Sequence, residues 1–260
     1  GGVIETASWK HIPDAILLAW TPGQEGGLAV ADILSGKANP SGKLPMTFPV
    51  SYLDIPSSYN FPYNYKNEHT GMWDFLWSGP KKEQKNVRYT EYEEGIYVGY
   101  RYFQTAGVPV SYPFGHGKAY TTFEYSKPVV KAAANGFTAT INVRNTGKHA
   151  GKETVQLYVS APAGEVEKPA YELKGFAKTK ELAPGESQTL TIAVDTYTLA
   201  HFNEATSAWE TAAGTYKVMF GADAADIRTV SDYKVKKAQS WKVNNVLAPA
   251  QPINELSLQE

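Results

Sequence analysis

The stretch Phe137-Thr-Ala-Thr-Ile-Asn-Val143 alternates apolar and polar residues with a period of two. Such alternation is typical of a strand buried on one face, here the face of Phe137, Ala139, Ile141 and Val143. The same pattern recurs at residues 155–159, 190–194 and 216–220. Turn-forming residues separate these runs, at 145–147, 183–186 and 213–214. Short strands at this spacing predict an immunoglobulin-like or fibronectin-type antiparallel β-sandwich.

Upstream of this region, the sequence predicts a strand, a turn and a helix in succession. Ala15-Ile-Leu-Leu-Ala-Trp20 is a short apolar run typical of a buried strand, and Pro22-Gly23 ends it. Apolar residues at helical spacing follow in 24–34, and Gly36 is a suitable helix stop. A single strand and helix cannot bury their own faces. We therefore expect this region to be the end of a larger α/β domain whose earlier strands lie outside this chain.

These patterns divide the chain into four expected parts. Residues 1–49 form the end of an α/β sandwich domain, and residues 121–238 form the β-sandwich. Between them, residues 50–120 are rich in aromatic residues and proline, and a connecting segment of this length is usually functional or packed on another domain. Within it, residues 97–103 fit either a strand or a helix. Residues 239–260 form a polar C-terminal tail, and the fold class is α+β overall.

Composition excludes several classes of function. Lys and Arg number 25 against 26 Asp and Glu, so a nucleic-acid partner is not expected. The longest clean apolar run, Ala15 to Trp20, is far shorter than the roughly 20 residues that cross a bilayer, so no membrane partner is expected either. Cysteine is absent, which excludes disulfides and thiolate metal sites. The five histidines show no metal-ligand spacing, and we expect neither a metal nor a cofactor.

Linked motifs along the chain resemble glycoside hydrolase family three. Trp20-Thr-Pro-Gly-Gln-Glu-Gly-Gly27, Ala31-Asp-Ile-Leu-Ser-Gly36 and Asn39-Pro-Ser-Gly-Lys-Leu-Pro45 closely resemble the end of its α/β sandwich domain. Tyr92-Glu-Glu-Gly-Ile-Tyr-Val-Gly-Tyr-Arg-Tyr-Phe103 resembles the segment that introduces its C-terminal domain. Tyr112-Pro-Phe-Gly-His-Gly117 resembles the start of its fibronectin type III-like domain, with Lys118-Ala119 where Leu-Ser is usual. The resemblance covers about residues 12–220.

The resemblance implies the C-terminal portion of a retaining, exo-acting β-glucosidase, which hydrolyses terminal β-D-glucosyl residues. Family members use an aspartate nucleophile on an N-terminal barrel and a glutamate acid/base in the sandwich domain. In the family's order both precede Trp20, and nothing in this chain matches either one. We therefore expect no catalytic residue here, and no activity from this chain alone.

The same resemblance implies the partners and the location. The expected partners are the N-terminal barrel and sandwich portion of the same enzyme, with a carbohydrate as the substrate of the whole enzyme. Assembly into a homo-oligomer is left open. A periplasmic or extracellular location is implied as well. The chain opens with Gly1-Gly2-Val3-Ile4 and without an initiator Met, which suggests a fragment or a processed chain.

Three residues are candidates for substrate binding: Glu25, Trp73 and Trp77. Glu25 lies where the predicted helix begins, and a carboxylate there can bond free N–H groups and favour the helix dipole, so a structural role is preferred to a catalytic one. Trp73 and Trp77 are four residues apart and would share a helical face. Packing against a neighbouring domain is preferred for them, and sugar stacking is the alternative.

Two other features leave alternatives open. Glu91, Glu93 and Glu94 lie near Arg88 and Arg101, so interdomain salt bridges are preferred to a catalytic carboxylate pair. His116, between two glycines, is expected in a turn. The rival function for the whole chain is a non-catalytic carbohydrate-binding or structural β-sandwich module.

Overall fold

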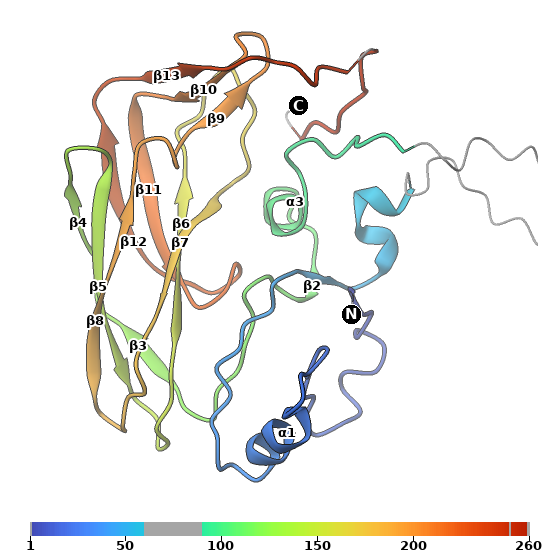
Figure 1. Cartoon of the computed structure of the whole chain (residues 1–260), viewed down its shortest axis with the longest axis vertical. Coiled ribbons are helices and arrows are strands. Elements are labelled where there is room, and N and C mark those ends of the chain that lie inside the picture. Colours follow the sequence, from blue (N-terminus) through green and yellow to red (C-terminus); the bar gives the residue numbers. More distant parts are fainter. Residues whose placement is uncertain (1, 60–89, 250, 259–260) are drawn as a thin grey trace, which may run out of the picture.

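The computed structural model of the chain describes residues 2–59, 90–249 and 251–258. Its helical elements are α1 (Gly26–Leu34), the 3-10 helices η1 (Tyr52–Asp54) and η2 (Pro56–Tyr59), and α3 (Tyr100–Thr105). The strands are β1 (Phe48–Pro49), β2 (Val110–Tyr112), β3 (Phe123–Tyr125), β4 (Val129–Ala132), β5 (Phe137–Asn145), β6 (Thr154–Ser160), β7 (Glu172–Lys178), β8 (Ser187–Val194), β9 (His201–Asn203), β10 (Ala208–Thr211), β11 (Gly214–Gly221), β12 (Ile227–Val235) and β13 (Gln239–Lys242). Figure 1 shows β3–β8, β11 and β12 as one sandwich, with α3 and residues 2–49, called the first region below, along one side.

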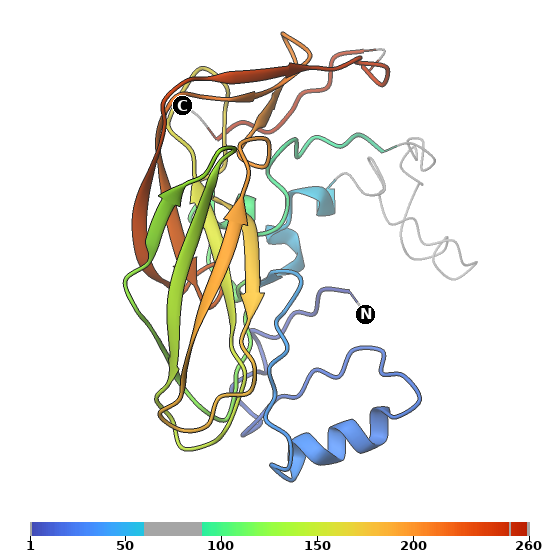
Figure 2. The ribbon, with the colours of Figure 1, turned by 60° about the vertical axis from the view of Figure 1, so that its left-hand side comes forward.

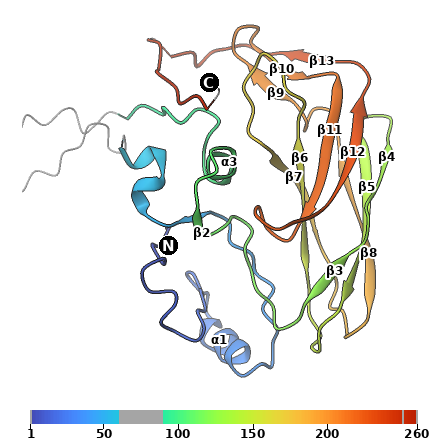
Figure 3. The ribbon, with the colours of Figure 1, turned by 180° about the vertical axis from the view of Figure 1, so that it is seen from behind.

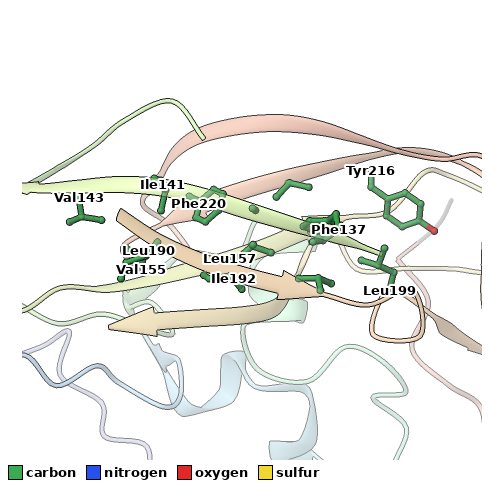
Figure 4. Close-up of a cluster of buried hydrophobic side chains, with 14 of the residues drawn as sticks. Phe137, Ile141, Val143, Val155, Leu157, Leu190, Ile192, Leu199, Tyr216 and Phe220 are labelled. Atoms are coloured by element: carbon green, nitrogen blue, oxygen red, sulfur yellow. The ribbon is translucent and has the colours of Figure 1, made fainter. Parts of the chain in front are cut away.

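Two antiparallel sheets face each other in the sandwich. One has the strand order β12-β11-β6-β7, and in the other β5 pairs with β8 along one edge and with β3 and β4 along the other. The predicted alternation is confirmed in β5, where Phe137, Ala139, Ile141 and Val143 are at most 1% exposed. Figure 4 shows these side chains meeting those of β6, β8 and β11 between the sheets. The antiparallel β-sandwich predicted from the sequence is thus confirmed.

Strand β6 differs from the predicted pattern because both of its faces are buried. Val155, Leu157 and Val159 point into the core as predicted, but Gln156 and Tyr158 on the other face are also buried. That second face is covered by the chain segments outside the sandwich, including α3 and residues 114–116. Period-two alternation alone therefore described only half of the environment of this strand.

The strand predicted at residues 15–20 is wrong. This segment forms no strand, and its apolar side chains are largely exposed: Ile16 and Leu17 by 42% each and Trp20 by 38%. A strand needs a neighbour to accept its hydrogen bonds, and no described residue pairs with this segment. The helix that follows is α1, and Gly36 ends it with a positive φ of 74° and an N–H bonded to Ile33 O.

The segment 97–103, which the sequence left open, contributes to helix α3. Phe103 of this helix is buried, and the Tyr100 ring stacks on Phe114 at 4.8 Å and meets Tyr158 edge-on at 5.9 Å. The Tyr100 hydroxyl also accepts a hydrogen bond of 2.8 Å from Leu173 N, at the start of β7. Helix α3 is therefore fixed against the outer face of the β6–β7 pair.

Strands β1 and β2 pair with each other, and β9, β10 and β13 form a small sheet at one end of the sandwich. Its order is β13-β10-β9, and Figure 2 shows it extending from the end of the sandwich. Seen from behind in Figure 3, α1 lies at the opposite end of the long axis. After β13 the chain turns back, and Leu256 N donates to Glu93 O at 2.7 Å. Within the described ranges, no helix combines the length and the apolar character needed to span a bilayer.

Candidate functional site: a polar seam beside an open apolar face

The structure does not bring the predicted substrate-binding residues together. Glu25 is the N-cap residue of α1, but its carboxylate makes no capping hydrogen bond and the side chain is exposed. The capping bond expected from the sequence is therefore wrong, while substrate binding by Glu25 stays a prediction. Trp73 and Trp77 lie outside the described residues, and their packing or stacking role stays a prediction too.

The acidic cluster near residue 93 is not the partner of Arg101. Arg101 of α3 forms its ion pair with Glu172 of β7, at 3.4 Å, and Lys174 lies 3.0 Å from the same carboxylate. Arg101 thus bridges the connecting segment and the sandwich, as expected of an interdomain pair, but with an acid that the sequence analysis did not name. Arg88, the other predicted partner, lies outside the described residues.

A polar seam joins the first region to the sandwich, and Gln156 is at its centre. The Gln156 side chain, 3% exposed, donates through Nε2 to Gly115 O (3.1 Å) and Ala222 O (2.7 Å). Its Oε1 accepts from Tyr158 OH at 2.6 Å. Gly115 has a φ of +80°, and a Cβ there would lie 2.1 Å from Gln156 Oε1. Glycine suits this turn, because a φ of +80° is strained for other residues and a Cβ would displace the Gln156 amide from its hydrogen bonds.

The motif Asn39-Pro-Ser-Gly-Lys-Leu-Pro45 forms the other side of the seam. Lys43 Nζ donates to Glu153 Oε1 (3.2 Å) and to Ala222 O (3.0 Å), and Glu153 is 7% exposed. Leu44 exchanges backbone hydrogen bonds with the 113–116 turn, through Leu44 N to His116 O (2.7 Å) and Gly115 N to Leu44 O (2.8 Å). Asn39 Nδ2 reaches Ala150 O at 2.8 Å. The motif therefore attaches the first region to the sandwich.

His116 lies in the predicted turn, where His116 N donates to Pro113 O at 3.1 Å. Its ring Nδ1 also lies 3.3 Å from Asp223 Oδ2. Burial would raise the pKa of Asp223, but hydrogen bonds from His116 and from the backbone N–H groups of Ala225 and Asp226 outweigh it and lower the pKa below its usual value. Asp223 is thus held as a carboxylate that orders the loop after β11.

The residues of the seam make structural hydrogen bonds and ion pairs, and they do not form a catalytic acid/base pair. Glu153 is bonded to Lys43 and to Tyr125 OH, and burial followed by the charge of Glu153 raises the pKa of Tyr125. Retaining glycosidases need one carboxyl group whose pKa is raised so that it can act as an acid, whereas the pKa of Asp223 is lowered. Within the described residues, no cluster of His, Cys, Asp or Glu is arranged to hold a metal ion.

Beside the seam, the first region carries an open apolar face. Its members are large apolar side chains of the segment that leads into and through α1. They are Ile12 (74% exposed), Ile16, Leu17, Trp20, Leu28 (66%) and Leu34 (70%). Large apolar side chains that are exposed together in one short segment favour an interaction site there. The segment of residues 12–34 therefore has these apolar side chains available to a partner.

The sequence analysis missed Gln156, Lys43 and Glu153 as the residues of the seam. Gln156 stands on the outward face of a strand, which in a free sandwich would be solvated. The sequence did contain a signal for these contacts, because Gly115 and Lys43 both lie in motifs that carry the family resemblance. The sequence did not indicate that these motifs contact each other.

Comparison with known proteins agrees with this geometry. The Glycosyl hydrolase family 3 C-terminal domain matches residues 1–100, and the Fibronectin type III-like domain matches residues 153–224. The chain matches the C-terminal part of family 3 glycoside hydrolases. The two matched stretches lie on opposite sides of the polar seam, so the seam lies between the family's two C-terminal units.

Among solved structures, β-glucosidase 3B from Thermotoga neapolitana in complex with glucose is similar with a TM-score of 0.80 and 41% identity, over 93% of this chain and 31% of that one. Among curated relatives, a probable β-glucosidase I of Emericella nidulans is 40% identical over 92% of this chain and 27% of its own length. β-Glucosidase A of Butyrivibrio fibrisolvens is 38% identical over 96% of this chain and 30% of its own length. The chain thus spans less than a third of these family 3 relatives.

Proposed function

We propose that this chain is the C-terminal portion of a retaining, exo-acting β-glucosidase and is inactive by itself. The observation that carries the proposal is the similarity to β-glucosidase 3B across 93% of the chain, which includes the first region, the seam and the sandwich. The structure of that enzyme was solved with glucose, and the two curated relatives described above carry the name β-glucosidase. Terminal β-D-glucosyl residues are therefore the substrate class proposed for the whole enzyme.

In this proposal the chain has two tasks. The sandwich is the rigid body, because its two sheets bury a continuous core. The seam carries the first region on this body through Lys43, Gln156 and Gly115, all of which have satisfied polar contacts. The open apolar face around Leu28 and Leu34 then receives the upstream part of the α/β domain, which supplies the acid/base glutamate.

Hydrolysis of an aryl β-glucoside tests the proposal. The purified chain should give the rate of the buffer blank, since a retaining mechanism needs two carboxyl groups about 5 Å apart across the scissile bond. Adding the upstream part of the same protein as a separate chain should restore turnover. The Glu25→Gln variant is the control, and turnover by the chain alone that this variant abolishes would overturn the proposal.

A second candidate function, carbohydrate binding by this chain itself, is favoured by a row of aromatic side chains on the small sheet. Phe202, Trp209 and Trp241 stand directly opposite one another on β9, β10 and β13. Tyr197, 48% exposed, lies 5.2 Å from the Trp241 ring and 6.0 Å from the Trp209 ring. Aromatic faces with one wet side are suitable for stacking against sugars.

Retention of the chain on insoluble β-glucan tests this second function. If the aromatic row binds the polymer, the Trp241→Ala variant should pass through the matrix while the chain itself is retained. The Trp9→Ala variant is the matched control, because Trp9 is also partly exposed but lies in the first region. Equal passage of all three proteins would leave only the scaffold function.

A further inference from the structure

Four segments that are distant in sequence meet beside α3. They are residues 52–59, residues 93–97, the loop between β6 and β7 at residues 161–171, and the C-terminal residues 251–258. In Figure 1 the last of these runs from the small sheet back towards α3. A polar tail has no reason of its own to take one path over a surface, so the contacts along this path indicate what fixes it.

One carboxylate accepts hydrogen bonds from two of these segments. Glu167, in the β6–β7 loop, accepts hydrogen bonds on Oε1 from Leu258 N (2.7 Å) and from Tyr97 OH, and on Oε2 from Ser257 Oγ (2.9 Å). Hydrogen bonds to a charged acceptor are stronger than those between neutral groups. A single side chain of the sandwich therefore holds both the tail and the segment that leads into α3.

The tail also contacts this segment directly. Leu256 N donates to Glu93 O at 2.7 Å, and the Glu255 carboxylate reaches Gly95, where a Cβ would lie 2.7 Å from Glu255 Oε2. Tyr97 is 1% exposed, and burial, followed by the hydrogen bond to Glu167, raises the pKa of its hydroxyl, so it remains a donor. The two segments thus share backbone and side-chain contacts.

Leu256 also contacts an earlier part of the connecting segment. It lines a hollow of about 360 Å³ together with Leu53, Asp54, Pro56, Tyr59, Tyr102 and Val108. Residues 53–59 and 93–97 both belong to the connecting segment, so the tail contacts this segment at two places that are distant in sequence.

We propose that residues 251–258 form a strap that holds residues 93–97 against the sandwich, with the Glu167 carboxylate as its latch. The strap and residues 93–97 then open and close together, while the sandwich core stays folded. Residues 251–258 thus position residues 93–97, which lead into α3. This inference does not depend on the proposed enzymatic function.

Hydrogen exchange on the whole chain tests the strap through the Glu167→Ala variant. The amides of Leu256, Leu258 and Tyr97 should all exchange faster by about tenfold or more, because the charge-assisted bonds that close the unit are gone. Amides in β5 and β11 should keep their protection. A chain that lacks residues 251–260 should show the same faster exchange at Tyr97.

The matched control is Glu165→Ala, since Glu165 is an exposed acid in the same loop, two residues away. In the Glu165→Ala variant, the amides of Leu256, Leu258 and Tyr97 should exchange as slowly as in the unchanged chain. Unchanged exchange at Tyr97 in the shortened chain would overturn the proposal, because the tail would then lie passively on the surface. Loss of protection in β5 and β11 of the Glu167→Ala variant would also overturn it, since Glu167 would then support the whole sandwich.

Discussion

The sandwich and the first region contain similar apolar residues, but the sandwich buries them and the first region leaves them exposed. Leu157 of β6 is completely buried, whereas Leu28 and Leu34 of α1 are 66% and 70% exposed. The strands of the sandwich have a second sheet to face. Among the residues that the structure describes, no strand pairs with the run 15–20, and large side chains of α1 remain exposed. Apolar periodicity therefore becomes a core only where a second layer is present.

The difference is sharpest when the two regions are separated. A polypeptide of residues 121–238 should unfold in one cooperative thermal transition, because its two sheets form a core of ordinary domain size. Its transition should lie below that of the whole chain, since Gln156 and Tyr158 lose the segments that cover them. A polypeptide of residues 1–49 should show no transition by circular dichroism. A molten sandwich, or a cooperative first region, would contradict the comparison.

The contrast between the buried core and the exposed α1 can also be measured by replacing single leucines with alanine. Leu157→Ala should lower the free energy of unfolding by about 2–5 kcal/mol, because it leaves a cavity in the core. Leu28→Ala, on the open face, should change it by no more than about 0.5 kcal/mol. Chemical denaturation of both variants measures the two values. Equal losses would mean that the face of α1 is covered in solution.

The sequence predicted the sandwich well because its signal is local. The alternation in β5, β8 and β11 depends only on neighbouring residues, and burial follows it residue by residue. The burial of Gln156 and the exposure of Ile16 could not be predicted in this way. Each depends on whether a distant segment covers it, and pattern within one segment carries no such information.

A smaller effect is expected at the seam. Gln156→Ala should lower the free energy of unfolding by about 2 kcal/mol, because Gly115 O, Ala222 O and Tyr158 OH lose their shared partner inside the protein. The control is Gln239→Ala on β13, where the side chain is exposed and the change should be close to zero. Thermal melts of the two variants measure the difference. Equal stabilities would show that the seam does not stabilise the attachment of the first region to the sandwich.

The smallest effect is a pH dependence at Asp223. The pKa of Asp223 is lowered in the folded chain, so its stabilisation is present above the ordinary aspartate pKa of about 3.9 and is lost as the pH falls through the folded-state pKa. Asp223→Asn should therefore cost about 1–2 kcal/mol near pH 6 and less as the pH falls below about 4. Urea unfolding across this range measures the difference.

Asp14→Asn, at an exposed position of the first region, is the control for this titration. Its unfolding free energy should follow that of the unchanged chain throughout the range. A cost of Asp223→Asn that stays constant down to pH 3 would show that the hydrogen bonds of Asp223 do not depend on its charge.

Hydrogen exchange across the whole chain tests most directly the central proposal, namely that a self-sufficient sandwich carries a first region whose exposed apolar side chains receive another part of the enzyme. In the chain alone, the amides of β5 and β11 should exchange only through global unfolding, and those of α1 should exchange with little protection. Addition of the upstream part of the same protein should protect α1 and leave β5 unchanged. Protection of α1 in the chain alone, equal to that of β5, would contradict the account.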